Sequence, residues 1–122
     1  MKKKVLIADD DVAIADLLVQ SLIEEGFDAQ KSVQSLRFYD MVRSYQPDLI
    51  LLDLMMPYLD GEDELRLMKL SPDTSHIPVI VVTAKPDVQI MEPRLRELGV
   101  LHVVLKPFDL NSLMALVKST IA

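Results

Sequence analysis

Apolar residues follow two patterns along this chain, short unbroken runs and helical spacing, and the two patterns alternate. Residues 5–8, 49–52 and 78–82 are unbroken apolar runs, which are typical of strands buried on both faces of a parallel sheet. Residues 27–33 and 101–105 predict two further strands, and the polar residues in 27–33 are typical of a strand at a sheet edge. The three unbroken runs are therefore predicted to form the centre of the sheet.

The segments between the strands predict helices. Ile14, Leu17, Leu18 and Leu22 recur at helical spacing, and Gly26 is expected to end the helix that they form. Three more helices are predicted over residues 36–45, 61–70 and 87–98, and a last one follows residue 108.

This alternation predicts an α/β fold with a single doubly wound five-stranded parallel sheet in a three-layer sandwich, one domain covering residues 1–122. Pro93 lies inside the predicted helix 87–98, and because proline lacks a backbone N–H we expect it to kink that helix or delay its start. Asp109 is predicted to cap the last helix, with Phe108 and Leu113 as a hydrophobic staple.

Composition narrows the classes of function. The 122 residues are enough for one domain with a sizeable core, and the net charge of -6 argues against a nucleic-acid surface. The chain has no cysteine, so disulfide and thiol chemistry are excluded. No apolar run approaches the length of a membrane span, and the N-terminus lacks a signal-peptide pattern. We therefore expect a cytoplasmic protein without membrane contact.

Polar residues stand at the predicted carboxyl ends of four strands: Asp9 and Asp10, Asp53, Thr83, and Lys106. Each is common in isolation, because aspartates cap helices, threonines form local turns and lysines are usually solvated. The carboxyl ends of parallel strands share one edge of the sheet, where open α/β folds bind their ligands. The sequence therefore predicts that these residues converge in one crevice.

The predicted cluster is suited to phosphoryl transfer. Three carboxylates at close range repel one another, and a hard divalent cation such as Mg²⁺ relieves this repulsion. Lys106 supplies a positive charge and Thr83 a hydroxyl donor for phosphoryl oxygens. A carboxylate nucleophile forms an acyl phosphate, so the chemistry alone predicts a Mg²⁺-assisted site with Asp53 as the acceptor.

The same motifs resemble the receiver domain of two-component response regulators. They are Ile7-Ala8-Asp9-Asp10-Asp11, Leu51-Leu52-Asp53-Leu54-Met55-Met56-Pro57 with Asp60-Gly61, Val82-Thr83-Ala84, and Lys106-Pro107-Phe108. Four motifs in this order cover the whole chain, which makes the resemblance specific. It implies a flavodoxin-like sandwich with the strand order 2-1-3-4-5, acting as a phosphoacceptor signalling domain rather than an enzyme.

The resemblance also implies roles at the metal site. Asp53 would be the phosphoacceptor and Asp10 a direct Mg²⁺ ligand, while Asp9 would act through a metal-bound water. The backbone carbonyl of Met55 would be the third protein ligand. In addition, Thr83 would bind a phosphoryl oxygen.

Lys106 would pair with the phosphoryl group, and the peptide bond before Pro107 would be cis.

Lys85 occupies a position that tunes the rate of dephosphorylation in the family. The alternative for this residue is a solvated lysine in a loop. The chain departs from the family at Val103, where an aromatic residue is usual, and a switch role for the neighbouring His102 is weaker than a structural one. The spacing from Thr83 to the motif lysine is about one residue longer than usual.

The leading hypothesis is a module that a sensor histidine kinase or a phosphotransfer protein phosphorylates on Asp53, which changes how it binds a partner. The chain ends with its last helix, so it either acts alone or comes from a longer regulator whose effector domain binds DNA; the domain itself is not expected to bind nucleic acid. Homodimers are a further partner that the family allows. The alternatives are a phosphorylation-independent interaction domain, which Val103 and Pro93 favour, and a flavodoxin-like cofactor binder, which the aspartates after the first strand disfavour.

Overall fold

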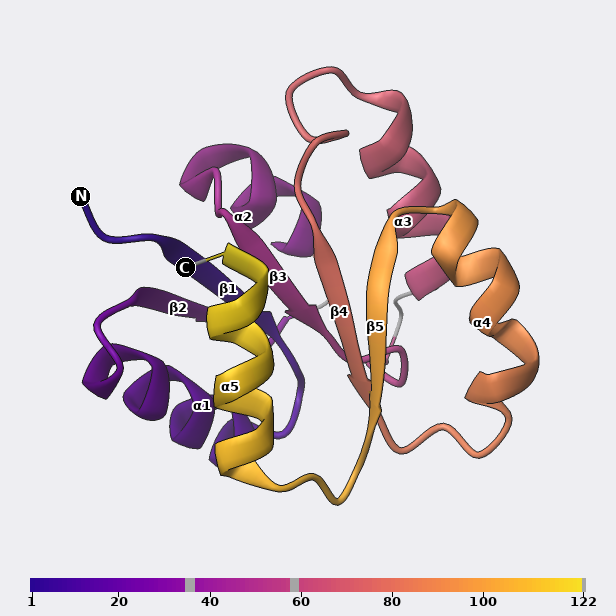
Figure 1. Cartoon of the computed structure of the whole chain (residues 1–122). Helices are drawn as coiled ribbons and strands as arrows, with labels where there is room; N and C mark the ends of the chain where they lie inside the picture. Colours follow the sequence, from indigo (N-terminus) through magenta and orange to yellow (C-terminus); the bar gives the residue numbers. More distant parts are fainter. Residues whose placement is uncertain (35–36, 58–59, 122) are drawn as a thin grey trace.

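A five-stranded parallel sheet forms the centre of the molecule (Figure 1). The computed structural model describes residues 1–34, 37–57 and 60–121. The strand order is β2-β1-β3-β4-β5, as predicted. The strands are β1 (Lys4–Ala8), β2 (Asp28–Ser32), β3 (Leu49–Leu52), β4 (Val79–Thr83) and β5 (Val100–Leu105). The helices are α1 (Val12–Glu24), α2 (Phe38–Tyr45), α3 (Gly61–Leu70), α4 (Val88–Glu97) and α5 (Leu110–Ile121).

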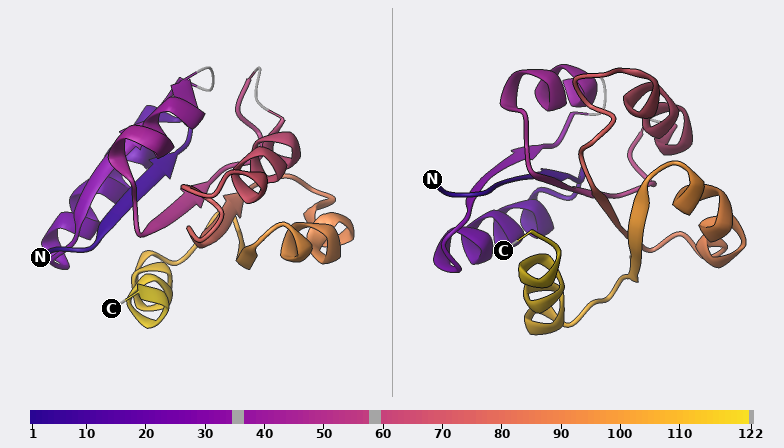
Figure 2. Two further views of the ribbon diagram at one scale, coloured as in Figure 1. Left: turned by 90° about the horizontal axis from the view of Figure 1, so that it is seen from above. Right: turned by 45° about the horizontal axis from the view of Figure 1, so that its top comes forward.

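The helices cover the sheet on both faces and give the fold its three layers (Figure 2). Helices α1 and α5 lie on one face, and α2, α3 and α4 lie on the other. Each face has its own apolar cluster, one containing Leu18 and Val117 and the other containing Phe38, Leu65 and Val88. The doubly wound sandwich predicted from the alternating pattern is therefore confirmed.

The three apolar runs form the middle strands. Every residue of β3 and β4 is buried, and so are the last four residues of β1. Residues 29 and 32 are the buried positions of the edge strand β2, while most of β5 at the other edge is exposed or half-buried. A central strand loses solvent on both faces, so it needs apolar residues throughout, whereas an edge strand tolerates polar ones.

Helix ends are found at Gly26 and Asp109, as predicted, and at Asp60, for which no cap was predicted. Helix α1 ends just before Gly26, whose φ of 97° is readily adopted only by glycine. Asp60 caps α3, because its carboxylate accepts hydrogen bonds from the backbone N–H groups of Glu62 and Asp63. Asp109 accepts a hydrogen bond from the N–H of Ser112 in the first turn of α5.

Three predictions need correction or remain partly untested. Leu17 is 47% exposed, and the buried face of α1 consists of Ala15, Leu18 and Leu22, because Leu17 lies about 100° around the helix from Leu18. Of the two alternatives for Pro93, a delayed start of α4 is wrong, because α4 begins at Val88 and continues past the proline, whereas the kink stays a prediction. The helix predicted to begin at residue 36 is described from residue 38 onward, so its predicted first residue lies outside the described residues.

No helix in the described part of the chain is both long enough and apolar enough to cross a membrane.

Candidate functional site

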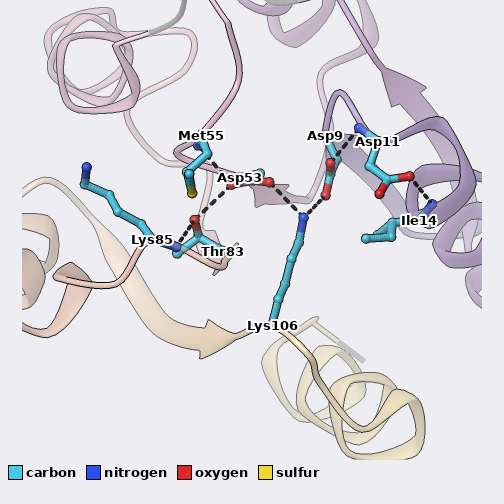
Figure 3. Close-up of polar contacts among 8 residues, drawn as sticks. All are labelled: Asp9, Asp11, Ile14, Asp53, Met55, Thr83, Lys85 and Lys106. Carbon is cyan, nitrogen blue, oxygen red and sulfur yellow. Dashed lines mark hydrogen bonds and ion pairs between the residues drawn. The ribbon is translucent and has the colours of Figure 1, made fainter.

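Four strand ends deliver the predicted site residues to one edge of the sheet (Figure 3). Asp9 and Asp53 directly follow β1 and β3, Thr83 is the last residue of β4, and Lys106 directly follows β5. Backbone hydrogen bonds continue the strand pairing into the site, from Asp53 N–H to the Ala8 carbonyl at 2.9 Å and from Lys106 N–H to the Thr83 carbonyl at 2.9 Å. Parallel pairing therefore fixes the backbone beneath the side chains.

Lys106 joins two of the carboxylates. Its Nζ lies 2.7 Å from Asp9 Oδ2 and 2.8 Å from Asp53 Oδ2 (Figure 3). The Lys106 side chain is 13% exposed, so the ammonium group is largely screened from water. Burial alone would lower the pKa of Lys106, but hydrogen bonds and charge attraction from Asp53 and Asp9 outweigh burial and raise that pKa. The lysine is therefore a cation held between two anions.

The other oxygen of Asp53 has two donors. Asp53 Oδ1 accepts a hydrogen bond from Thr83 Oγ1 at 2.9 Å and one from the backbone N–H of Met55 at 2.9 Å. Thr83 is fully buried, and its hydroxyl oxygen accepts a hydrogen bond from the backbone N–H of Lys85 at 3.2 Å. Three hydrogen-bond donors thus surround the Asp53 carboxylate and hold it in one orientation.

Asp9 is buried beside this group, with 3% of its surface exposed. Its Oδ1 accepts a hydrogen bond from the backbone N–H of Asp11 at 2.9 Å. Burial raises the pKa of Asp9, and the hydrogen bonds from Lys106 and Asp11 only partly offset this. Asp11 itself caps α1, because its carboxylate accepts a hydrogen bond from the Ile14 N–H at 3.2 Å.

Asp9, Asp10 and Asp53 form a group of carboxylates that could hold a metal ion. One carboxylate oxygen of each lies within 4.8 Å of those of the other two, and Asp10 is exposed while its neighbours are buried. Mg²⁺ prefers oxygen ligands, and it keeps several water molecules when it is bound by protein, so its site must be accessible to water. The donor set therefore fits the predicted ion.

The remaining predicted residues are found around this site. The Lys106–Pro107 peptide bond is cis, as the resemblance implied. Val103 is half-buried and packs against the core on the α2-α3-α4 face, and His102 is exposed on β5. Lys85 Nζ lies 3.7 Å from Asp87 Oδ1, so its side chain is directed toward the start of α4.

Two of the contacts that were not predicted from the sequence lie at the centre of the site. One is the second partner of Lys106, the Asp9 carboxylate; the other is the N–H of Met55, a residue for which only the backbone carbonyl was assigned a role. The carbonyl role stays a prediction. A backbone N–H donor cannot be recognised from the type of side chain, because every residue except proline has one. The turn signals of Pro57 and Gly61 nevertheless indicate the region in which such a donor is expected.

Comparison with known proteins agrees with this geometry. Residues 5–118 match the family model of the response regulator receiver domain. Sporulation initiation phosphotransferase F of Bacillus subtilis is 35% identical over 118 residues, which cover 97% of this chain and 93% of that protein. The DNA-binding response regulator MtrA of Mycobacterium tuberculosis strain H37Rv is 34% identical over 119 residues, 98% of this chain and 50% of its own length. The chain thus spans about half the length of the MtrA proteins it matches.

Solved structures are similar over nearly the whole chain. The receiver domain of the Francisella response regulator 1452 has a TM-score of 0.84 and 28% identity, with 98% of this chain and 97% of that chain covered. The chemotaxis response regulator CheY4 of Vibrio cholerae has a TM-score of 0.88 and 18% identity over 98% of this chain and 99% of its own, and supports the fold alone. Sequence motifs, strand order and family match together establish that this chain belongs to the response regulator receiver domain family of two-component systems.

Proposed function

We propose that this domain accepts a phosphoryl group on Asp53 from the phosphohistidine of a sensor histidine kinase or a phosphotransfer protein. The observation that carries the proposal is the arrangement around Asp53, where Lys106 and Thr83 contact the carboxylate while Asp9 and Asp10 lie beside it. A cation, a hydroxyl donor and a metal-binding group around one carboxylate are what an acceptor of a highly charged phosphoryl group requires.

In the proposed reaction, an oxygen of Asp53 attacks the phosphorus atom of the phosphohistidine. The new P–O bond forms as the P–N bond breaks, and the imidazole leaves with the electron pair of that bond and takes up a proton. The product is an acyl phosphate on Asp53. Lys106 Nζ and the Thr83 hydroxyl now donate to Asp53, and both are close enough to donate to phosphoryl oxygens attached there instead. Water later cleaves the acyl phosphate and restores the carboxylate.

Mg²⁺ would be held by the carboxylates of Asp10 and Asp53 and by the backbone carbonyl of Met55, with Asp9 acting through a metal-bound water, as the resemblance implies. When bound, the ion neutralises negative charge shared by the carboxylates and the phosphoryl oxygens. Among the described residues, Lys106 is the cation that pairs with these carboxylates, and its one positive charge faces three negative ones, so the site is short of positive charge before any phosphoryl group arrives.

The proposal extends to the wider protein. Residues 1–122 form one receiver domain that acts in the cytoplasm, signals by changing its contacts with a partner, and does not itself bind nucleic acid. The MtrA relatives, described as DNA-binding, are about twice as long as this chain, which supports a role for such a domain in controlling an attached or separate effector. The match covers 93% of sporulation initiation phosphotransferase F, so that relative consists of little more than such a domain.

A second candidate function is a binding domain that needs no phosphorylation. It is favoured by Val103, whose half-buried side chain is aliphatic. Valine has neither the ring nor the hydroxyl through which an aromatic residue at this position would change its rotamer together with Thr83. The same experiment tests both functions.

The test is intact-mass analysis of the protein after incubation with a small-molecule phosphodonor, with and without Mg²⁺. We expect a gain of one phosphoryl group that requires Mg²⁺ and is absent in Asp53→Asn. A fast acid quench prevents loss of the adduct by hydrolysis. No adduct despite demonstrated Mg²⁺ binding would contradict phosphorylation on Asp53 and favour the second candidate.

A further inference from the structure

Strand β5 contains one residue more than its pairing with β4 requires. Val79 of β4 pairs with Val100. The next residue of β4, Ile80, pairs with His102, which leaves Leu101 without a partner in the pairing of these two strands. Two residues of one strand that face a single residue of its neighbour form a β-bulge. Beyond the bulge the pairing is regular to the end of both strands.

The packing of the side chains shows the same irregularity. Val100 and Val103 both pack in the apolar cluster on the α2-α3-α4 face, although residues three apart in a regular strand point to opposite faces of the sheet. Val104 packs in the cluster on the other face. Leu101 and His102 are both exposed although they are consecutive. The bulge therefore exchanges the faces on which all later residues of β5 lie.

The bulge accounts for the long spacing between Thr83 and Lys106. This spacing is about one residue longer than is usual in the receiver family, and the bulge takes up one residue before the strand reaches the site. Thr83 pairs with Leu105, and the Lys106 N–H donates to the Thr83 carbonyl at 2.9 Å. Lys106 therefore reaches Asp9 and Asp53 although the chain before it carries an extra residue.

A bulge nearer to the end of β5 would change the core or the site. If Val103 were the extra residue, His102 would take its half-buried position and place an imidazole in the apolar cluster. If Leu105 were the extra residue, its own N–H, rather than that of Lys106, would meet the Thr83 carbonyl. The position of the bulge thus decides where Lys106 lies.

Arg96 of α4 binds the chain at the bulge. Its Nη1 donates to the Leu101 carbonyl at 2.9 Å. Glu92, one turn earlier on α4, orients the same guanidinium group, because its Oε2 accepts from Nε and Nη2 at 3.4 Å. Helix α4 lies beside β5 (Figure 1), and Leu95, next to Arg96, is fully buried, so the helix that carries this group is fixed to the core. A planar guanidinium group can hold a carboxylate and a carbonyl at the same time.

We propose that Arg96 is a positioning residue for Lys106. It holds the β-bulge at Leu101, and the bulge at this place brings Lys106 into register with Thr83 and beside Asp53. The effect of this register on phosphoryl transfer rests on the proposed function, whereas the hold of Arg96 on the bulge does not.

Two single-residue deletions test the bulge. Deletion of Leu101 makes Val100 and His102 neighbours, as their partners on β4 already are, so the rest of β5 should keep its register and its faces. Deletion of Val103 gives a chain of equal length in which His102 must enter the apolar cluster.

Hydrogen exchange of the Lys106 amide measures both outcomes. We expect its rate to stay within about threefold of the parent without Leu101 and to rise about tenfold or more without Val103. If the loss of Leu101 speeds this exchange as much as the loss of Val103 does, Leu101 is not an extra residue and the proposal is overturned.

Arg96→Met tests the hold on the bulge, because it keeps an unbranched side chain and removes the donor. The measured quantity is the exchange rate of the Lys106 amide, which donates to Thr83, divided by that of the Asp53 amide, which donates to Ala8 on the other side of β3. We expect this ratio to rise about tenfold or more. A general loss of stability would not raise it, because the Asp53 amide would then exchange faster as well.

The effect of Arg96→Met should depend on the bulge. In the protein without Leu101 the substitution should leave the ratio unchanged, because no bulge remains to be held, whereas a general role of Arg96 in α4 would act in both backgrounds. Arg94→Met is the matched control, since Arg94 lies on the same helix and contacts Glu62 instead of β5; it should leave the ratio unchanged. A ratio that Arg96→Met does not raise, or raises equally in both backgrounds, overturns the proposal.

The consequence for the site is measured as the rate of phosphoryl uptake from a small-molecule donor in the presence of Mg²⁺. Arg96→Met should lower this rate about threefold or more, because a displaced Lys106 supports the reaction less well, and should have no effect without Leu101. An unchanged rate beside a raised exchange ratio overturns the positioning of Lys106 for the reaction. If the parent takes up no phosphoryl group, the proposed function fails, and the exchange ratios alone decide whether Arg96 holds the bulge.

Discussion

At the scale of single residues, Lys106 both belongs to the candidate site and is expected to stabilise the folded protein. Its ammonium group lies within hydrogen-bond distance of both Asp9 and Asp53, and Asp10 adds a third carboxylate nearby. Removing one partner of a buried ion pair leaves the other charge uncompensated, which costs more than the pair itself contributes.

We therefore predict that Lys106→Met lowers the free energy of unfolding by about 3 kcal/mol in the absence of Mg²⁺. Mg²⁺ should stabilise this variant more than the parent, because the ion replaces the missing positive charge and binds only the folded state. Urea unfolding with and without Mg²⁺ measures both effects.

Lys118→Met is the matched control, since Lys118 pairs with Glu25 at an exposed position and should change stability by less than about 1 kcal/mol. Equal effects of the two substitutions would show that Lys106 is not an essential counter-charge.

Gly61 illustrates a steric constraint beside the site. A Cβ atom at this position would lie 2.6 Å from Cδ2 of Leu54, the residue that follows Asp53 in the sequence. The half-buried Leu54 side chain must turn away from the new methyl group, so Gly61→Ala should destabilise the protein by at most about 1 kcal/mol, and the better helix propensity of alanine offsets part of this cost. In a Leu54→Ala background the same substitution should be neutral or stabilising. Thermal unfolding of the four proteins measures this coupling, and additive effects would contradict the steric explanation.

At the scale of elements, the capping residue of α5 gives the fold a pH dependence. The hydroxyl and backbone N–H of Ser112 donate to the Asp109 carboxylate and lower the pKa of Asp109 below its usual 3.8. A group with a lower pKa in the folded state stabilises the fold above the unfolded pKa and loses this effect as the pH falls through the folded pKa.

Asp109→Asn removes the charge and keeps an acceptor. Its urea midpoint should lie below that of the parent at about pH 7, and the difference should shrink as the pH falls from about 3.8, where Asp109 becomes neutral in the unfolded parent, through the lower pKa at which it becomes neutral in the folded parent. A difference that stays constant between about pH 7 and about pH 3 would show that the charge does not matter.

At the scale of the whole molecule, the sheet separates two apolar clusters. Val42 on α2 belongs to the cluster on one face and Val117 on α5 to the cluster on the other, and both are fully buried. Because the central strands contribute side chains to both clusters, we expect the two to unfold together although they do not touch across the sheet.

Val42→Ala and Val117→Ala should each lower the free energy of unfolding by about 1–3 kcal/mol. The double variant should lose the sum within about 0.5 kcal/mol and should still unfold in one transition. Circular dichroism and tyrosine fluorescence monitored through urea unfolding test this, and two separated transitions would mean that the faces are independent units.

Much of the architecture was predictable because it depends on local chemistry. The helix over residues 61–70 is found where it was predicted, since Asp60 caps it and the pattern after Gly61 is helical. The unbroken runs 49–52 and 78–82 predicted central strands, and β3 and β4 are found there. Leu17 fits the helical spacing of its apolar neighbours but is 47% exposed. Which side of a helix is buried depends on where the sheet and the other helices lie, and the sequence of the helix itself does not give their positions.

The sequence by itself determined the alternation of strands and helices, the receiver family, and the set of polar residues at the strand ends, because each of these follows from side-chain types at fixed local spacing. Only the tertiary structure decided which atoms meet: that Lys106 contacts Asp9 as well as Asp53, that the Met55 N–H contacts Asp53, and that Arg94 contacts Glu62. Such contacts join atoms from segments up to 97 residues apart, or backbone groups that every residue shares, so no local pattern encodes them.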